Sequence, residues 1–260
     1  MKASEVVRAV GAAMEVASGL HLAVADTRVL HNSNKLALRL LPCDVFARVA
    51  FAGREVFQAE LEIGRRLAEA ESPVASPDPR VDPRVYERDG FVVTLWTYYE
   101  QSRHGVSPAD YAKALERLHA GMARVDVAVP HFTARVAEAH RLVASRDRTP
   151  ELEDSDRELL RMTLRNRSRA IGEYSSPEQL LHGEPHSGNV LSTESGPLFV
   201  DLETCCRGPV EFGLAHVPED VSDCYRGADR ELLRECRLLV LAMVAAWRWD
   251  PDDRFPDRDY

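Results

Sequence analysis

Three polar residues in two nearby segments could together support phosphoryl transfer. Glu184 is followed five residues later by Asn189, and Asp201 comes about ten residues further on. Transfer of a phosphoryl group from ATP requires little covalent chemistry from the protein. A carboxylate orients the attacking hydroxyl, and oxygen ligands hold Mg²⁺ against the phosphates. A loop carboxylate, an amide and a second carboxylate at a strand end would supply these groups.

The residues around Glu184 resemble the catalytic loop of the aminoglycoside and choline kinase family, whose pattern is His-Gly-Asp, four residues and Asn. Here the segment reads Leu181-His182-Gly183-Glu184-Pro185-His186-Ser187-Gly188-Asn189. The later Phe199-Val200-Asp201-Leu202-Glu203 resembles the metal-binding element of the same family. The resemblance implies that Glu184 is the catalytic carboxylate and that His182 braces the loop. It also implies that Asn189 and Asp201 bind Mg²⁺.

The N-terminal segment carries weaker matches to the nucleotide-binding residues of this family. Ser33 and Asn34 resemble the Ser-Asn pair in the turn that covers the nucleotide. Arg48 stands where a basic residue pairs with the ATP phosphates, and Glu60 stands where its ion-pair partner is found. Lys35 is the alternative to Arg48 as the phosphate-binding cation. The implied cofactors are ATP, with GTP as an alternative, and Mg²⁺.

Two aromatic residues end a predicted strand where the hinge of the family meets adenine. Trp96 and Tyr98 could line the nucleotide pocket there, or they could belong to an ordinary hydrophobic core. Because such a hinge contacts adenine mainly through backbone groups, the sequence leaves both interpretations open.

The sequence departs from the family pattern at two positions. Glu184 replaces the usual Asp and is one methylene longer, although it keeps the same acid–base chemistry. Gly213 stands where an Asp usually precedes Leu214-Ala215, which removes an interaction expected to brace the loop. These departures keep an alternative function open, a catalytically weakened, nucleotide-binding regulatory module of the pseudokinase kind.

A zinc site is an alternative interpretation of the same loop. His182, Glu184 and His186 have the residue types of a zinc hydrolase. However, the zinc motif needs two His four residues apart on a helix, with Glu directly after the first. Gly183 and Pro185 oppose a helix, so we prefer the phosphoryl-transfer interpretation.

The elements that must position these residues fall into two groups. Hydrophobic periodicity and turn signals predict an N-terminal order of helix, three strands, helix and two strands, at residues 2–18, 27–30, 36–40, 45–51, 55–71, 85–87 and 91–98. After residue 99 the pattern is mainly helical, with a helix starting at Pro108, three more at 131–145, 154–171 and 229–247, and short strands at 180–182, 190–192 and 198–202. We therefore expect an α+β, bilobal, protein-kinase-like fold with a nucleotide-binding lobe at 1–98 and a catalytic, substrate-binding lobe at 99–260.

Composition limits the partners of the protein. The 260 residues carry a net charge of -9, which argues against nucleic-acid binding because phosphate neutralisation needs clustered Lys and Arg. Charged residues interrupt the early apolar runs, and the apolar stretch 238–247 is about half the roughly 20 residues that span a bilayer. We expect a cytoplasmic protein without a membrane partner and with five free thiols, mostly buried. Its partner would be a small molecule with a hydroxyl group: an aminoglycoside, another antibiotic or a metabolite. The oligomeric state is not predicted.

Overall fold

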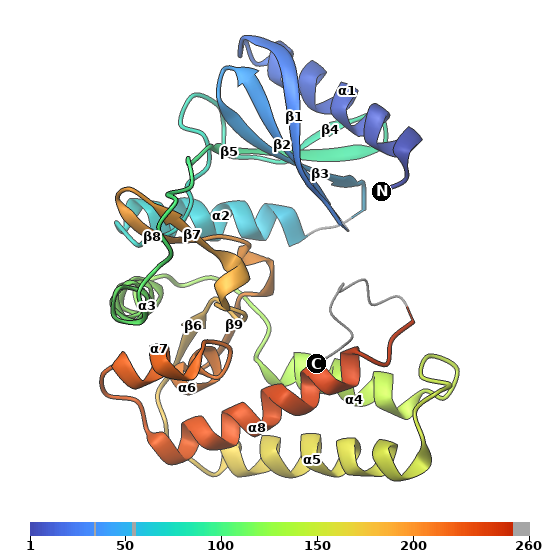
Figure 1. Cartoon of the computed structure of the whole chain (residues 1–260), viewed down its shortest axis with the longest axis vertical. Coiled ribbons are helices and arrows are strands. Elements are labelled where there is room, and N and C mark those ends of the chain that lie inside the picture. The colour runs from blue at the N-terminus through green and yellow to red at the C-terminus, as the bar shows by residue number, and fades with distance from the viewer. Residues whose placement is uncertain (34, 54–55, 252–260) are drawn as a thin grey trace. The chain divides into compact units, whose positions relative to one another are not determined.

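The computed structural model describes residues 1–33, 35–53 and 56–251. Contacts divide the chain into two units, Met1–Val106 with Leu191–Glu203, and Ser107–Val190 with Thr204–Tyr260. The first unit contains the five-stranded sheet, and the second contains most of the helices (Figure 1). This architecture, a unit with an antiparallel sheet and a mainly helical unit, matches the expected α+β, protein-kinase-like fold.

The sheet of the first unit is antiparallel, with the strand order β1-β2-β3-β5-β4. Its strands are β1 (Val24–Asn32), β2 (Leu36–Pro42), β3 (Val45–Phe51), β4 (Tyr86–Arg88) and β5 (Phe91–Thr97). Helix α1 (Ala3–Gly19) precedes β1, and α2 (Val56–Glu69) lies between β3 and β4 in the chain. The predicted meander, hairpin and two helices of this part of the chain are all present.

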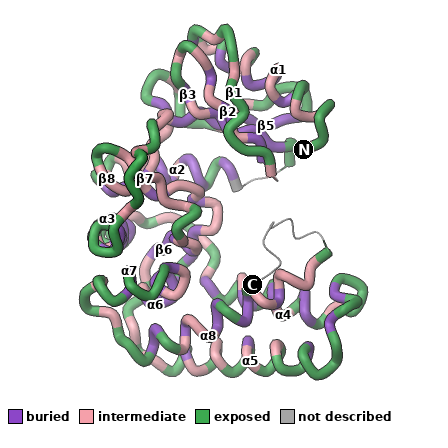
Figure 2. The backbone as a smooth tube through the Cα atoms, in the orientation of Figure 1, coloured by how far each residue is buried: buried purple, intermediate pink, exposed green. Residues whose placement is uncertain are grey.

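The two helices cover opposite faces of this sheet (Figure 1). Small residues of α1, Ala9 and Ala13 among them, pack with Leu38, Val49 and Val93 in one apolar cluster. On the other face, Phe57 of α2 packs with Ala50 and Val92. Strand β5 lies between these layers and is buried along nearly its whole length (Figure 2). Because side chains alternate along a strand, Arg48 of β3 projects to the α2 face, like Ala50.

A hairpin from late in the chain also belongs to the first unit, apart from its first residue, Val190. It consists of β7 (Val190–Thr193) and β8 (Gly196–Phe199). Phe199 exchanges backbone hydrogen bonds with the segment 73–75: its N–H donates to Pro73 O at 2.8 Å and its carbonyl accepts from Ala75 N at 2.9 Å. The predicted strand 198–202 is therefore too long. Asp201 has a φ of 64°, a left-handed conformation that ends the strand, and the short 3₁₀ helix Leu202–Thr204 follows.

The second unit is built around four long helices. These are α3 (Pro108–Met122), α4 (Thr133–Ala144), α5 (Asp154–Gly172) and α8 (Arg230–Trp247), all of which the sequence predicts. Residues of α4, α5 and α8 share one apolar core, which includes Val143, Leu164 and Leu239. None of the helices in the described ranges combines the length and the hydropathy of a bilayer-spanning segment.

Three short elements of the second unit are absent from the prediction: β9 (Cys206–Pro209), α6 (Val210–Leu214) and α7 (Glu219–Cys224). Strand β9 pairs antiparallel with β6 (Glu178–Leu181). At four residues β9 is too short to show an alternating pattern, and Gly208-Pro209 resembles a turn.

Of the five cysteines, Cys205, Cys206 and Cys236 are buried, Cys43 is partly buried and Cys224 is exposed.

Candidate active site

A cluster of charged side chains lies on the α2 face of the first unit. Lys35 directly precedes β2, Arg48 is in β3, and Glu60 is in α2. Asp201 and Glu203 lie in the segment after β8. Ala37 is opposite Arg48 across the β2–β3 pair, so Lys35, two residues earlier, projects to the same face. These residues come from four segments, three within residues 35–60 and one at 201–203, and the fold of the first unit brings them together.

Arg48 is at the centre of this cluster. Its Nη1 is ion-paired with Glu60 Oε1, and its Nη2 lies 3.1 Å from both Asp201 Oδ1 and Glu203 Oε1. Its side chain is 9% exposed and that of Glu60 only 1%. The ion pair between Arg48 and Glu60 that the sequence predicts is therefore present in the first unit.

Lys35 contacts the same carboxylates as Arg48. Its Nζ lies 2.8 Å from Glu203 Oε1 and 3.2 Å from Asp201 Oδ1. Both basic residues considered for phosphate binding are thus in one cluster. Sequence reasoning assigned no role to Glu203, although an acidic residue two positions after Asp201 was the available signal.

The charges in the cluster control the ionisation of its members. Burial opposes ionisation of Arg48, but Glu60, Asp201 and Glu203 raise its pKa above the ordinary value, so it stays charged. Burial also opposes ionisation of Asp201, yet Arg48 and Lys35 lower its pKa. For Glu60, burial and the other two carboxylates prevail over Arg48 and raise the pKa. Asp201 is thus held as an anion.

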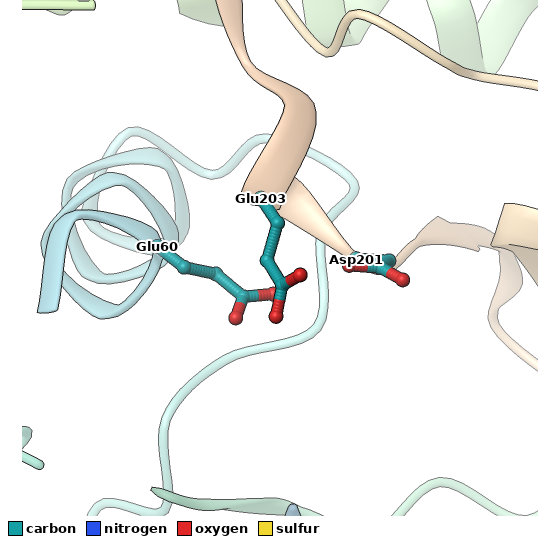
Figure 3. Close-up of side chains that lie close together, drawn as sticks. All are labelled: Glu60, Asp201 and Glu203. Atoms are coloured by element: carbon teal, nitrogen blue, oxygen red, sulfur yellow. The ribbon is translucent and has the colours of Figure 1, made fainter. Parts of the chain in front are cut away.

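The three carboxylates suit a divalent cation. One oxygen from each of Glu60, Asp201 and Glu203 lies within 4.8 Å of the others, and Figure 3 shows Glu60 projecting from α2 toward the other two. Carboxylate oxygens are the ligands that Mg²⁺ and Ca²⁺ prefer. The backbone supports this arrangement, because Leu202 N donates to Glu60 Oε1 at 3.1 Å. The donor set therefore fits a metal ion of this kind.

The loop 182–189 of the second unit has a tightly constrained backbone. Gly183 has a φ of 89°, and a Cβ at this position would lie 1.9 Å from Thr204 O, so no other residue fits. Thr204 Oγ1 donates to His182 O at 3.1 Å, and His182 itself is completely buried. Burial of His182 agrees with a bracing role, which stays a prediction.

Glu184 and Asn189 are connected within this loop. Asn189 Nδ2 donates to Glu184 O at 3.0 Å, and Tyr111 Oη donates to Pro185 O. The Glu184 carboxylate is ion-paired with Arg135 of α4, a residue that the sequence did not single out. Arg135 gave no signal beyond its place in a predicted helix that contains other arginines.

The family model of the phosphotransferase enzyme family matches residues 28–251. The chain belongs to this family. Membership confirms the resemblance and the enzyme class, a small-molecule kinase, that the loop residues predict. The comparison with curated proteins finds no match.

Solved structures share the fold of this phosphotransferase at low sequence identity. Choline kinase LicA from Streptococcus pneumoniae has a TM-score of 0.67 at 13% identity, over 94% of this chain and 92% of that one. A variant of aminoglycoside 2'-phosphotransferase IIIa with GDP has a TM-score of 0.68 at 13% identity, over 93% and 90%. The amicoumacin kinase hAmiN with AMP-PNP, Ca²⁺ and amicoumacin has a TM-score of 0.62 at 11% identity, over 98% and 82%.

The zinc alternative for this phosphotransferase gains no support. Among the described residues, the one group of metal-ligating side chains with converging atoms is Glu60, Asp201 and Glu203. His186 instead belongs to the loop structure, because its Nδ1 accepts from Gly188 N at 3.1 Å.

The predicted hinge and turn residues have local structural contacts in the first unit. Trp96 is 5% exposed, its Nε1 donates to Thr94 Oγ1 at 2.9 Å, and its ring packs against Gly64 of α2. The Trp96 side chain is therefore part of the core. Tyr98 packs under the guanidinium of Arg39, 3.9 Å from the ring centroid.

The turn before β2 closes through a hydrogen bond from Ser33 N to Lys35 O at 3.0 Å. Asn34 lies outside the described residues. The nucleotide-binding roles of Ser33, Asn34, Trp96 and Tyr98 stay predictions.

Proposed function

We propose that this phosphotransferase transfers the γ-phosphate of ATP to a hydroxyl group of a small molecule. The observation that carries the proposal is the cluster in which Arg48 and Lys35 contact Asp201 and Glu203. Phosphoryl transfer depends on cations that hold the phosphates and on carboxylates that hold the metal ion. Both kinds of group meet in the first unit.

The charges of the cluster are suited to a nucleotide with its metal ion. The carboxylates of Glu60, Asp201 and Glu203 outnumber the cations Lys35 and Arg48 by one. A divalent cation would bind carboxylates that the two basic residues now neutralise, and Lys35 and Arg48 would then be available to the phosphates. Relatives with AMP-PNP and Ca²⁺, and with GDP, favour a nucleotide and a divalent ion. We propose ATP and Mg²⁺, with GTP as the alternative nucleotide.

Mg²⁺ would be held by Asp201, and Glu203 is a further candidate ligand because it shares both of its basic partners with Asp201. Asn189 stays a proposed ligand on the basis of the family resemblance. When bound, the metal ion would neutralise negative charge on the transferring phosphoryl group.

Glu184 would orient the hydroxyl of the substrate and accept its proton. The loop holds Glu184 through Gly183 and Asn189, and its side chain is 24% exposed. A carboxylate that is fixed but accessible suits this role.

The substrate would be an aminoglycoside, another hydroxylated antibiotic, or a hydroxylated metabolite. Relatives named for choline, aminoglycosides and amicoumacin span this range. We propose that the protein acts in the cytoplasm, where ATP is available.

The first experiment measures the thermal midpoint of the purified full chain with ATP, GTP and ADP, each with and without Mg²⁺. We expect a rise with nucleotide that depends on Mg²⁺. ADP release is then measured with aminoglycosides, other hydroxylated antibiotics, sugars and amino alcohols. Absence of any shift at saturating nucleotide would refute the proposal. A shift without turnover of any acceptor or of water would favour the regulatory-module alternative.

A further inference from the structure

Glu184 and Arg135 form part of a chain of contacts inside the second unit. Arg135 Nη2 is ion-paired with Glu184 Oε1, and its guanidinium lies over the ring of Trp247 at 5.1 Å from the centroid. Arg135 is on α4 and Trp247 is the last residue of α8. Two helices of the core therefore hold the carboxylate of the loop.

These contacts restrain the Glu184 side chain, which is one methylene longer than the Asp of the family pattern. Glu has one more rotatable bond than Asp, so holding its carboxylate requires a further contact. Arg135 supplies that contact through Oε1. Oε2 accepts no hydrogen bond from the residues that the structure describes, so it is left for a substrate hydroxyl.

The contacts of Arg135 are not those expected of a residue that mainly stabilises the fold. Its Nη1 is buried and has no hydrogen-bond partner among the described residues, which costs free energy. Arg157 on α5 is a contrast in the number of its hydrogen bonds. Its Nε is also buried without a partner among the described residues, but its two terminal nitrogens make four hydrogen bonds, to Val143 O, Thr149 Oγ1, Thr149 O and Leu152 O. A pair with an unsatisfied donor is weak support for stability. The placement of Arg135 fits a role in orienting Glu184.

We propose that Arg135 is a positioning residue, which holds the Glu184 carboxylate for phosphoryl transfer and is itself held by Trp247. This inference rests on the proposed function, in which Glu184 orients the substrate hydroxyl.

The test uses ADP release from Mg²⁺–ATP by the full chain, with the fastest acceptor from the screen, or with water where no acceptor reacts. Arg135→Gln should lower kcat by about 10²-fold, because small displacements of a catalytic group have effects of this size. The KM for ATP and the thermal midpoint should change little. Arg135→Lys should recover part of the rate. Arg141→Gln, on an exposed residue of the same helix, is the matched control and should behave as the wild type.

A double-mutant cycle separates positioning from a general structural effect. In the Glu184→Gln background, Arg135→Gln should cost little further rate, because the group that it positions is already disabled. An equal loss in both backgrounds would overturn the proposal. An unchanged kcat for Arg135→Gln would also overturn the proposal. A loss of rate that is accompanied by a matching fall in the thermal midpoint would do the same, because lower stability would then explain it. Wild-type protein that binds no nucleotide, or binds it without ADP release, would instead refute the proposed function.

Two further variants test the two ends of the chain of contacts. Trp247→Leu should lower kcat by up to roughly tenfold, as expected for loss of a cation–π contact, whereas Trp249→Leu should leave it unchanged. Glu184→Asp should also lower kcat, because the shorter side chain draws the carboxylate away from Arg135. A higher kcat for Glu184→Asp would contradict the proposal.

Discussion

Gly213 of α6 faces the ring of His119 in α3, where a Cβ on Gly213 would lie 3.4 Å from Nε2. His119 is 3% exposed, and its Nδ1 is 2.9 Å from Tyr225 Oη. Its Nε2 makes no hydrogen bond to the described residues. Burial and the neighbouring His182 lower the pKa of His119 to about 3. The carboxylate that the family pattern has at position 213 would thus stand beside a neutral imidazole.

Gly213→Asp should raise the pKa of His119, because an anion next to Nε2 favours the imidazolium. The spacing of 3.4 Å is at the short end of ordinary van der Waals contact, so a Cβ fits at this position. The pKa is measured by NMR titration of the His119 ring signals. Gly172→Asp adds the same charge where a Cβ meets nothing within 4 Å and should leave this pKa unchanged. An unchanged pKa in Gly213→Asp as well would contradict the contact.

Acidification should destabilise the protein partly through His119. Its pKa is about 3 in the folded state against an ordinary 6.5, so below about pH 6.5 the unfolded chain binds a proton that the folded chain excludes. The contribution of His119 to the free energy of unfolding is therefore complete above pH 6.5. It falls by about 1.4 kcal/mol for each pH unit below that value. Urea unfolding near pH 7, 6 and 5 should show a shallower pH dependence for His119→Gln than for the wild type. Parallel curves would show that His119 binds its proton over the same pH range in the folded and unfolded states.

Arg48→Met should destabilise the first unit far more than Lys35→Met. Removal of Arg48 leaves Glu60, 1% exposed, without its cation, at a cost of about 3–5 kcal/mol. Lys35 contacts Asp201 and Glu203, and both carboxylates keep Arg48 as a partner without it. The measurement is the free energy of unfolding in urea. Equal losses in the two variants would contradict the central place of Arg48 in the cluster.

Asp201→Ala should abolish both the Mg²⁺-dependent rise in thermal midpoint with ATP and the release of ADP. Arg48 and Lys35 hold Asp201 as an anion, the form that binds a metal ion. Glu194→Gln, on an exposed residue of the β7–β8 turn, is the control and should retain both properties. Normal turnover in Asp201→Ala would refute the metal assignment.

Gly183→Ala should disrupt the loop that carries Glu184. The left-handed backbone alone costs an alanine about 1–2 kcal/mol, and a Cβ 1.9 Å from Thr204 O forces the backbone to move. We expect a lower thermal midpoint and loss of turnover. Gly172→Ala, at the open end of α5, should be neutral or slightly stabilising. A Gly183→Ala protein with wild-type activity would show that the loop tolerates displacement.

The sequence by itself determined the main helices and strands, the family, and the loop that contains Glu184 and Asn189. These features are local. Hydrophobic periodicity, caps such as Ser107 before α3, and short motifs depend on residues near one another in the chain. The strand that was predicted to reach residue 202 ends at Phe199, and Asp201 beyond it has a left-handed backbone. The prediction was wrong here because no local sequence signal marks that conformation.

Only the tertiary structure decided which charged residues act together. Lys35, Arg48 and Glu203 meet because the alternation of β2 and β3 turns two side chains to the α2 face, and because Phe199 joins a late hairpin to the first unit. The contact of Arg135 with Glu184 spans 49 positions of the chain. Such pairs depend on how elements that are distant in the sequence pack together. The packing, and not the local sequence, determines which of the many arginines contacts a given carboxylate.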